Sequence, residues 1–563
     1  MNNRPHGLPP LWAIWRNPIV VRCWRSRMRL RGFLPWAVIV VVLCAFVFFM
    51  VFNALSERMH AETAMAARAC LLPMLIIQGV ILLLLGTGAV TTNLTIEEDE
   101  GMIEFQRLTP LPPAWKIAGY LFGLPVREYV LFALTLPFTI AVIWLGHLPL
   151  AAVVKVYAVL ATSTVLYHLT GYVAGFTLRK RKLGSRLVQI AVIMLYLVLP
   201  QLSNFGYVVF EHLTIRPVFR EQLSHYVLEG ISRYAPRSEK VEVAFYGLEL
   251  PQVVFSLIIQ SALICVFIAM VRQKWLDAAR HTLGKFPALV VMTGVAVLVL
   301  GNLLPLITDG RVFPTRLLKS GLDSGLGRAI ILGMVPKSSA AEAGMLVALL
   351  AMLLTVLGVF LLLQITPTRF EAIRGWRRAA RLGQPRLPWL SDEATALPWA
   401  VLFGVVAGLT VWLFGRAMGH SVWMAGKAFA QPMVQWVALL PVLVFCSAVA
   451  VAETWERKGV FILVMVVWVL PALVMLVLTS ASDHGATIGF YVGSISPLAA
   501  YFSGMVAADA QWAVAGLHGP RAFFCGFGLH LATAAVVFAF WWRAGRSLRV
   551  KALDRGPRPL PAP

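Results

Sequence analysis

The chain has 563 residues, of which 59% are hydrophobic and only 13% are charged, and its mean hydropathy is +0.77. A soluble protein has about 45–50% apolar and about 25% charged residues, so a soluble enzyme with a modest membrane anchor is excluded. Intrinsic disorder is also excluded, because it requires low hydrophobicity. The composition indicates an all-α polytopic membrane protein. The formal net charge of +23 then has to be explained by where the charges lie.

Twelve apolar stretches are long enough to cross a bilayer, which takes about 20 residues in a helix. The first follows a basic N-terminus and is longer than the core of a signal peptide, so we expect it to be retained. The predicted spans are 33–54, 70–92, 126–146, 150–176, 187–210, 250–271, 286–308, 343–365, 397–415, 431–452, 459–479 and 522–542. The segment 485–507 is apolar but rich in Gly and Ser and contains Pro497. It is either re-entrant or an external helix, and as a thirteenth span it would move the C-terminus outside.

The positive charges predict the orientation of the spans. With a cytoplasmic N-terminus, 32 of the 49 Lys and Arg residues lie in loops on the cytoplasmic side. This bias follows the positive-inside rule and favours twelve spans with both termini in the cytoplasm. Trp36, Trp144 and Trp399 lie at predicted span ends, as an interfacial aromatic belt requires. Nucleic-acid binding is not expected, because it needs a basic face on a folded domain and the sequence leaves no room for one.

The chain divides near 275–285, with six predicted spans on each side, or near 366–396. Residues 1–32 are expected to form an amphipathic interfacial helix, and 33–275 a six-helix transmembrane domain. The remaining segments are 286–365 with spans seven and eight, the basic cytoplasmic linker 366–396, spans nine to twelve in 397–545, and the cytoplasmic tail 546–563. The linker is rich in Arg, and contact with anionic lipid is its simplest interpretation.

Motifs for enzymatic chemistry are absent from the sequence. There is no GxxxxGK[ST] P-loop, no HExxH and no GxSxG, and the six cysteines form no CxxC pair, so we expect neither an enzyme nor a metal site. His168 and His530 lie in predicted spans and are expected to be packing residues. Glu128 is the only acid inside a predicted span, and it follows Arg127, with which it can pair. Lys155 is a weak candidate for substrate contact.

One predicted cytoplasmic loop departs from the basic pattern. Four consecutive acids, Glu97–Glu100, precede Gly101, and a short amphipathic segment follows. Its apolar residues Ile103, Phe105 and Leu108 could form a docking surface that ends at Pro110. The alternatives are a solvated surface helix, or contact with a basic cytoplasmic partner.

This loop resembles the signature of ABC-2-type transporter permeases, the membrane subunits of ABC transporters. In that family an acidic run is followed by Gly-Thr-Leu-Glu, a few mostly apolar residues, Thr-Pro, and a Gly-Lys-Leu-like start of span three. Here Glu100–Glu104 corresponds to the first part, Leu108-Thr109-Pro110 to the second and Gly119-Tyr120-Leu121 to the third. Met102, Gln106 and Tyr120 depart from the pattern.

The N-terminus carries a second resemblance. Asn17–Arg22 is similar to the Asn-Pro-Val-Leu-x-Arg-Glu opening of a subset of these permeases, in which this segment is an interfacial helix, although Cys23 stands where Glu is usual. The resemblance implies interfacial roles for Arg22, Arg25, Arg27 and Arg29. It covers about residues 17–275; spans seven to twelve are either a divergent second permease half or an added membrane module.

The resemblance implies a function. Residues 97–110 would be a coupling helix that docks on a separate cytoplasmic ABC ATPase, present in two copies, which binds ATP and Mg. The residues implied in coupling are Glu97, Glu98, Glu100, Gly101, Ile103, Glu104, Phe105, Leu108, Thr109 and Pro110. The chain itself would bind no cofactor and would lie in a bacterial inner membrane, with further extracytoplasmic or membrane partners an open question.

Two other functions stay open from the sequence. One is an ion-coupled secondary transporter with twelve spans, and the other is a membrane scaffold or assembly factor that transports nothing. A secondary transporter usually keeps carboxylates at mid-bilayer, which these spans lack. The substrate and the role of the loops 211–249 and 480–521 are not indicated by any motif.

Overall fold

The computed structural model is almost entirely helical and describes residues 13–58, 62–177, 190, 193–194, 196–205, 207–228, 242–307, 339–384, 386–421, 431–481, 483–505 and 519–554. Within these ranges, eleven helices are long and apolar enough to cross a membrane, so the chain is a multi-pass membrane protein. They coincide with eleven of the twelve predicted spans. Most of the remaining one, 187–210, lies outside the described residues.

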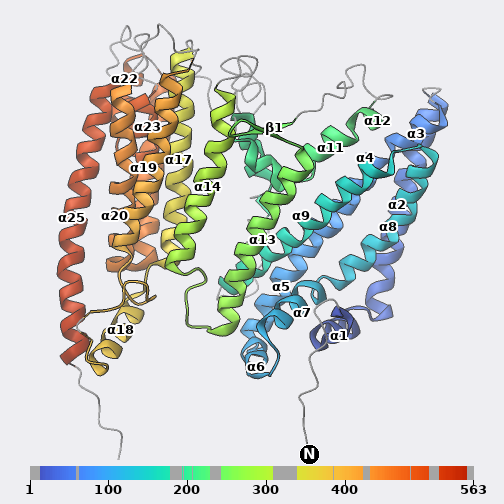
Figure 1. Ribbon diagram of the computed structural model, residues 1–563, viewed down its shortest axis with the longest axis horizontal. Helices are drawn as coiled ribbons and strands as arrows, with labels where there is room; N and C mark the ends of the chain where they lie inside the picture. The colour runs from blue at the N-terminus through green and yellow to red at the C-terminus, as the bar shows by residue number, and fades with distance from the viewer. Residues whose placement is uncertain are drawn as a thin grey trace, which may run out of the picture. The chain divides into compact units, whose positions relative to one another are not determined.

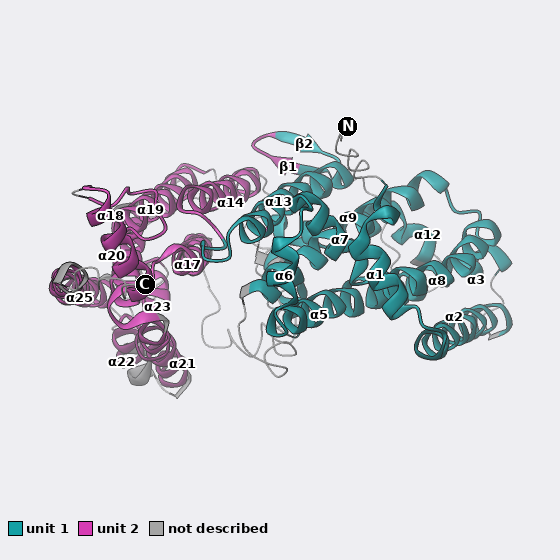
Figure 2. Cartoon of the chain, turned by 90° about the horizontal axis from the view of Figure 1, so that it is seen from below, with its two compact units in different colours: residues 1–203, 208–243, 248–282 teal, residues 204–207, 244–247, 283–563 magenta. Residues whose placement is uncertain are grey.

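The chain forms two compact units, which Figure 2 shows in different colours. The first contains residues 1–203, 208–243 and 248–282, and the second contains residues 204–207, 244–247 and 283–563. A two-stranded hairpin of β1 (Val243–Phe245) and β2 (Leu248–Leu250) is the only sheet among the described residues.

The first unit begins with short helices and continues with long apolar ones (Figure 1). A continuous helix, Thr63–Asp99, contains the π-helical segment η2 (Val80–Gly86) between α4 (Leu71–Gly79) and α5 (Thr87–Asp99). The elements of this unit are η1 (Ile14–Arg16), α1 (Pro18–Arg27), α2 (Leu30–Arg58), α3 (Thr63–Ala69), α4 (Leu71–Gly79), α5 (Thr87–Asp99), α6 (Met102–Leu108), α7 (Pro113–Gly123), α8 (Val126–Leu145), α9 (Leu150–Thr177), η3 (Leu199–Phe205), η4 (Val208–Leu213), α11 (Arg216–Gln222), α12 (Ser224–Leu228) and α13 (Gln252–Leu276).

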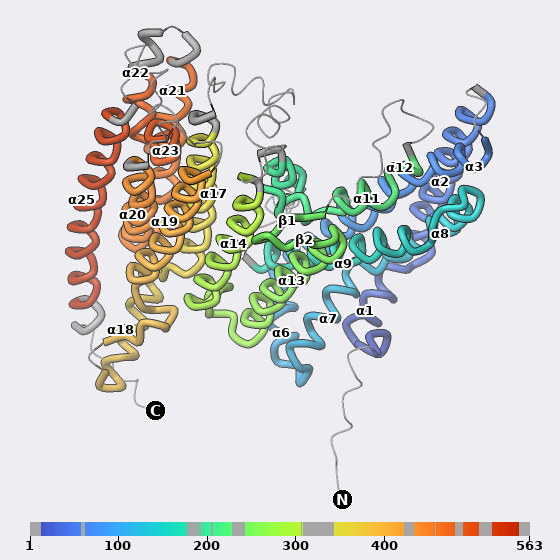
Figure 3. Tube along the Cα trace, turned by 45° about the horizontal axis from the view of Figure 1, so that its top comes forward, coloured from blue at the N-terminus to red at the C-terminus, as the bar shows by residue number. Residues whose placement is uncertain are grey.

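One apolar cluster of this unit joins the elements around the acidic loop. It includes Ile19 of α1, Leu94 of α5, Ile103 of α6, Tyr120 of α7 and Trp275 of α13, all of them buried. Because these side chains come from five helices, the loop between α5 and α7 is fixed on a packed support. Figure 3 shows α6 beside α7 in the same unit.

The second unit contains the remaining candidate spans. Its elements are α14 (Lys285–Leu306), α17 (Ser339–Ile365), α18 (Arg369–Arg381), α19 (Leu397–Gly419), α20 (Gln431–Leu463), the π-helical η6 (Val464–Val469), α21 (Leu470–Ala481), α22 (Asp483–Gly493), α23 (Pro497–Met505) and α25 (Gly519–Asp554). In its described part, 485–505, the segment is therefore not one continuous helix: α22 and α23 are both short, and a turn separates them.

The backbones of α19 and α20 lie very close to one another. A Cβ atom added at Gly404 would lie 2.6 Å from the Cα of Val442, and one at Gly408 would lie 2.2 Å from the carbonyl oxygen of Ala438. These two glycines are four residues apart, which is the small-xxx-small spacing that lets membrane helices pack closely.

Candidate functional site

The acidic loop forms a tight helix–turn–helix at the end of α5. The helix ends at Asp99, and Gly101 adopts a φ of 72°, a left-handed conformation that favours glycine. The chain then forms α6, and Thr109 returns to an extended backbone before Pro113 begins α7. Glu104 lies in the first turn of α6, where a carboxylate interacts favourably with the helix dipole.

Glu97 fastens α5 to two other helices. One carboxylate oxygen accepts a hydrogen bond from Arg22 of α1 at 2.6 Å, and the other accepts from the hydroxyl of Tyr120 on α7 at 2.6 Å. Burial opposes the charged form of Arg22, but the hydrogen bond and charge of Glu97 outweigh it and raise the pKa of Arg22. Burial, with the charge and hydrogen bond of Glu97, also raises the pKa of Tyr120. Glu97 is thus a structural anchor of the loop.

Lys116 of α7 binds the C-terminal end of α6. Its ammonium group donates to the carbonyl oxygens of Arg107 at 3.3 Å and Thr109 at 3.2 Å, which lie at the helix C-terminus. The same group lies over the ring of Trp275 at 5.6 Å. Burial, and then the charge of Arg107, lower the pKa of Lys116. Both ends of α6 are therefore held by α7 and its neighbours.

The two faces of α6 differ in exposure. Ile103 is 1% exposed and packs in the cluster beneath the helix. Met102, Phe105 and Leu108, spaced three residues apart, are 36%, 61% and 85% exposed. We call these three residues the α6 stripe. The acids Asp99, Glu100 and Glu104 lie close to it along the chain and are exposed as well, and Glu104 pairs with Arg107. The exposed face is thus apolar with an acidic border.

The structure divides the ten sequence-predicted coupling residues into two groups. Six are exposed: Glu100, Gly101, Glu104, Phe105, Leu108 and Pro110. Glu98 and Thr109 are half-buried, Ile103 is buried, and Glu97 is engaged by Arg22 and Tyr120. Sequence reasoning did not assign Met102 to the exposed stripe. The spacing of Met102, Phe105 and Leu108 could have indicated it, because residues three apart share a helix face.

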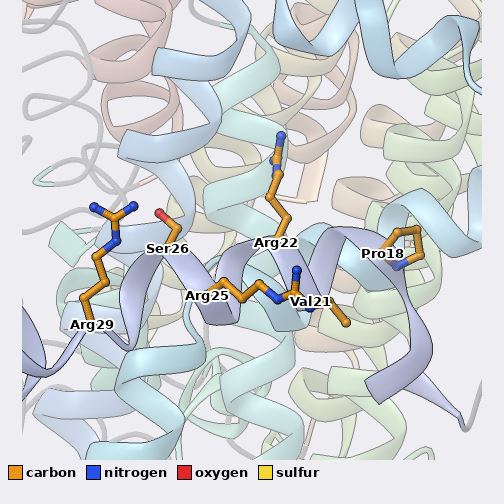
Figure 4. A pocket seen from close by; sticks show the side chains of 6 residues that line it. All are labelled: Pro18, Val21, Arg22, Arg25, Ser26 and Arg29. Atoms are coloured by element: carbon orange, nitrogen blue, oxygen red, sulfur yellow. The ribbon is translucent and has the colours of Figure 1, made fainter.

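The N-terminal helix α1 is held against α7. The side chain of Asn17 accepts a hydrogen bond from the Ile19 amide at 2.9 Å, which caps α1, and donates to the carbonyl oxygen of Trp115 at 2.7 Å. Arg25 and Arg29 are exposed and line a hollow of about 470 Å³ together with Arg22 (Figure 4).

The other predicted site residues of the first unit lie apart from α6. Arg27 is half-buried, and burial lowers its pKa against the opposing charge of Glu128. Lys155 is exposed on α9, where its ammonium group donates to Gln222 of α11 at 3.3 Å. Arg127 and Glu128 form the expected pair, at 2.6 Å.

A polar network inside the first unit contains side chains for which the sequence predicted no role, with the exception of His168. Gln78 donates to the hydroxyls of Thr135 and Thr139, both at 2.9 Å, and accepts from Tyr157 at 2.6 Å. His168 is hydrogen-bonded to the hydroxyl of Tyr129 and to the carbonyl oxygen of Leu82 in the π-helical segment η2, both at 2.9 Å. His168 is therefore a hydrogen-bonded packing residue, as predicted.

A small cavity adjoins this network. It measures about 330 Å³ and is lined mainly by apolar side chains, with the hydroxyl-bearing residues Tyr129, Tyr157 and Thr164 among them.

His530, the other histidine in a predicted span, lies on α25 of the second unit. It is buried, and its Nε2 atom has no hydrogen-bond partner in the described ranges.

A second acid, which is half-buried, lies in a candidate span in addition to the one predicted from the sequence. Glu453, which lies just beyond the predicted span 431–452, falls within the candidate span Met433–Glu456. Its carboxylate accepts from the Ala396 amide at 2.8 Å, from the Thr395 hydroxyl at 3.0 Å and from the Trp541 indole at 2.6 Å. These donors fix α19, α20 and α25 together.

Among the described residues, no three His, Cys, Asp or Glu side chains are placed to hold a metal ion. The acidic loop, with its exposed apolar stripe and anchored ends, is the candidate site that the geometry defines most fully. No protein-family model, no curated protein and no solved structure matches the chain.

Proposed function

We propose that the chain is the transmembrane permease subunit of an ATP-driven exporter in a bacterial inner membrane. In this proposal α6 is the coupling helix, and it docks on a separate cytoplasmic ABC ATPase. The observation that carries the proposal is the α6 stripe: three apolar side chains exposed on a helix whose two ends are tied to α5 and α7. An exposed apolar surface with a polar rim is typical of a protein-binding site.

The anchors explain how such a helix could transmit movement. Glu97 connects α5 to α1 through Arg22 and to α7 through Tyr120. A displacement of α6 by a bound ATPase would therefore move these helices together, because the ion pair and Lys116 resist local unwinding of the loop. Two ATPase copies closing on ATP and Mg would drive the membrane helices between inward-facing and outward-facing states.

The acidic border suggests the chemistry of the partner. Asp99, Glu100 and Glu104 are exposed and close to the stripe along the chain, and they would face basic residues at the rim of an apolar groove. Such charges mainly increase the association rate and the specificity for the partner. Phe105 and Leu108 would supply most of the affinity.

The decisive experiment is co-purification of the detergent-solubilised chain with a cytoplasmic ATPase. Phe105→Asp/Leu108→Asp should abolish the association, since it places charge in the apolar contact. Leu382→Asp is the matched control: Leu382 is 62% exposed and follows α18 in the second unit. It should leave the association unchanged.

Transport assays then separate the alternatives. Transport that needs an ion gradient but no nucleotide would contradict the proposal and support a secondary transporter. A stable complex whose ATP turnover does not respond to any substrate would support a scaffold or assembly factor instead.

A further inference from the structure

The second unit contains a hollow of about 540 Å³ that the proposed export function does not use. It lies among α18, the segment that follows α18, the part of α20 just before its kink at Glu456, and the C-terminal part of α25. Figure 1 shows α18 beside one end of α25. Its volume is in the range of small-molecule sites, about 300–1,000 Å³.

Four arginines line the hollow: Arg369, Arg386, Arg546 and Arg549. None of them forms an ion pair with a carboxylate among the described residues, although Arg369 donates a hydrogen bond to the carbonyl oxygen of Thr454. Arg546 lies over the ring of Trp542 at 4.9 Å and Arg549 over the ring of Trp376 at 4.7 Å. Stacked guanidinium groups keep their N–H edges free to bind an anion.

The two acids of the lining are already engaged. Glu393 lies 3.8 Å from Arg374 and 3.9 Å from Arg378, and neither of these arginines lines the hollow. Glu453 accepts hydrogen bonds from Thr395, Ala396 and Trp541, as described above. The unpaired charge of the hollow is therefore positive.

The position of the hollow along α25 indicates its depth in the membrane. The apolar part of this helix ends at Trp541 and Trp542, and Arg543, Arg546 and Arg549 follow. Tryptophan followed by arginine marks the level of the lipid headgroups. Trp389, which also lines the hollow, stacks on Trp399 at 5.3 Å and adds an aromatic wall.

We infer that this hollow binds the phosphate headgroup of an anionic phospholipid. Guanidinium groups bind phosphate oxygens through paired, charge-assisted hydrogen bonds, which a single-sign arginine cluster at headgroup level can supply. The tryptophan faces would contact the glycerol and the first acyl carbons. A free phosphate ion has the same charge but none of the apolar contacts, so the two sources of phosphate are distinguishable.

Native mass spectrometry of the full chain in detergent tests the inference. Phosphatidylglycerol and phosphatidylcholine with identical acyl chains are titrated separately. The wild type should bind the first phosphatidylglycerol about tenfold more tightly than phosphatidylcholine, and Arg546→Gln/Arg549→Gln should lose this preference. Arg381→Gln/Arg543→Gln is the matched control, because it removes two exposed arginines, one of α18 and one of α25, that do not line the hollow. It should keep the preference.

A second variant tests the cavity without changing its charge. Gly545 lines the hollow, and a Cβ atom there would meet no atom within 4 Å, so Gly545→Leu should fold. Its side chain should obstruct the headgroup and weaken phosphatidylglycerol binding about tenfold. The inference is overturned by an equal loss in both arginine pairs or by no loss in the Arg546/Arg549 pair or in Gly545→Leu. It is also overturned if inorganic phosphate displaces the lipid when both are at the same concentration.

Discussion

Glu97 shows what a single residue contributes to the proposed coupling site. The sequence places it in an acidic run, where it was expected to face a partner. In the structure its two carboxylate oxygens accept hydrogen bonds from Arg22 and Tyr120. Tyr120 is one of the departures from the permease pattern. Contacts between residues 97 and 120 depend on how α5 and α7 pack, so a motif comparison could not pair them.

We therefore expect Glu97→Gln to weaken the fold rather than the docking surface. The substitution removes the charge that Arg22 faces, and the Arg22 and Glu97 side chains are 35% and 18% exposed, so the loss should be about 1 kcal/mol. A lowered melting temperature in detergent would show it. Glu104→Gln is the control: Glu104 pairs with Arg107, but it is 68% exposed, so removal of its charge should cost less. An equal decrease in both variants would contradict the anchoring role.

His212 predicts a pH dependence for the first unit. This side chain is fully buried on η4, with Nδ1 2.7 Å from the hydroxyl of Ser256, and burial lowers its pKa from about 6.5 to about 3. Below about pH 6.5 the unfolded chain binds a proton that the folded chain does not. The contribution of neutral His212 to the free energy of unfolding is therefore complete above about pH 6.5. It decreases as the pH falls, by up to about 1.4 kcal/mol per pH unit, until about pH 3.

Melting curves between neutral and acidic pH check this dependence. His212→Asn should flatten the decrease in melting temperature on acidification, since its side chain does not titrate. His147→Asn replaces an exposed histidine with positive φ by a residue that tolerates this conformation, and it should keep the wild-type slope. Identical slopes in all three proteins would refute the assignment.

At the scale of elements, the long apolar runs predicted the helices because each must satisfy its backbone internally in a bilayer. The same rule gives no information about how helices face one another. The sequence thus predicted a short amphipathic segment near 103–108, but not that Ile103 turns inward and Met102 outward. It also gave no sign of the hollow beside α18, which forms only where α18 packs on α25.

The contact between α19 and α20 yields a prediction about packing. Gly408→Ala should destabilise the second unit by about 1–3 kcal/mol, because the added methyl group would meet the carbonyl oxygen of Ala438. Gly294→Ala on α14 is the control: its Cβ would meet nothing within 4 Å, and alanine favours a helix. Thermal unfolding in detergent should show a lower melting temperature for Gly408→Ala only. An unchanged melting temperature of Gly408→Ala would mean that the backbones of α19 and α20 can move apart without loss of stability.

At the scale of the whole molecule, the net charge of +23 is best understood as orientation. Two-thirds of the Lys and Arg residues lie in loops predicted to be cytoplasmic, and the predicted spans contain almost none. The number of crossings depends on the segment 187–210. Twelve crossings would place both termini on one side of the membrane, whereas the eleven candidate spans alone would place them on opposite sides.

Two engineered cysteines can decide between these arrangements. Phe105 and Leu248 are 61% and 62% exposed, so Phe105→Cys and Leu248→Cys should react equally well with a water-soluble maleimide wherever the reagent has access. The native cysteines Cys265 and Cys525 are exposed and should first be replaced by alanine, with that parent protein as the background control.

We expect Leu248→Cys to react in intact cells with a membrane-impermeant maleimide, and Phe105→Cys to react only after permeabilisation. Three crossings would then separate the two positions: α8, α9 and the segment 187–210. If 187–210 did not cross, α8 and α9 alone would return the chain to the starting side, and both cysteines would show the same accessibility. Equal accessibility of the two cysteines would refute the twelve-span topology. The α6 stripe would then be cytoplasmic only if neither cysteine reacted in intact cells.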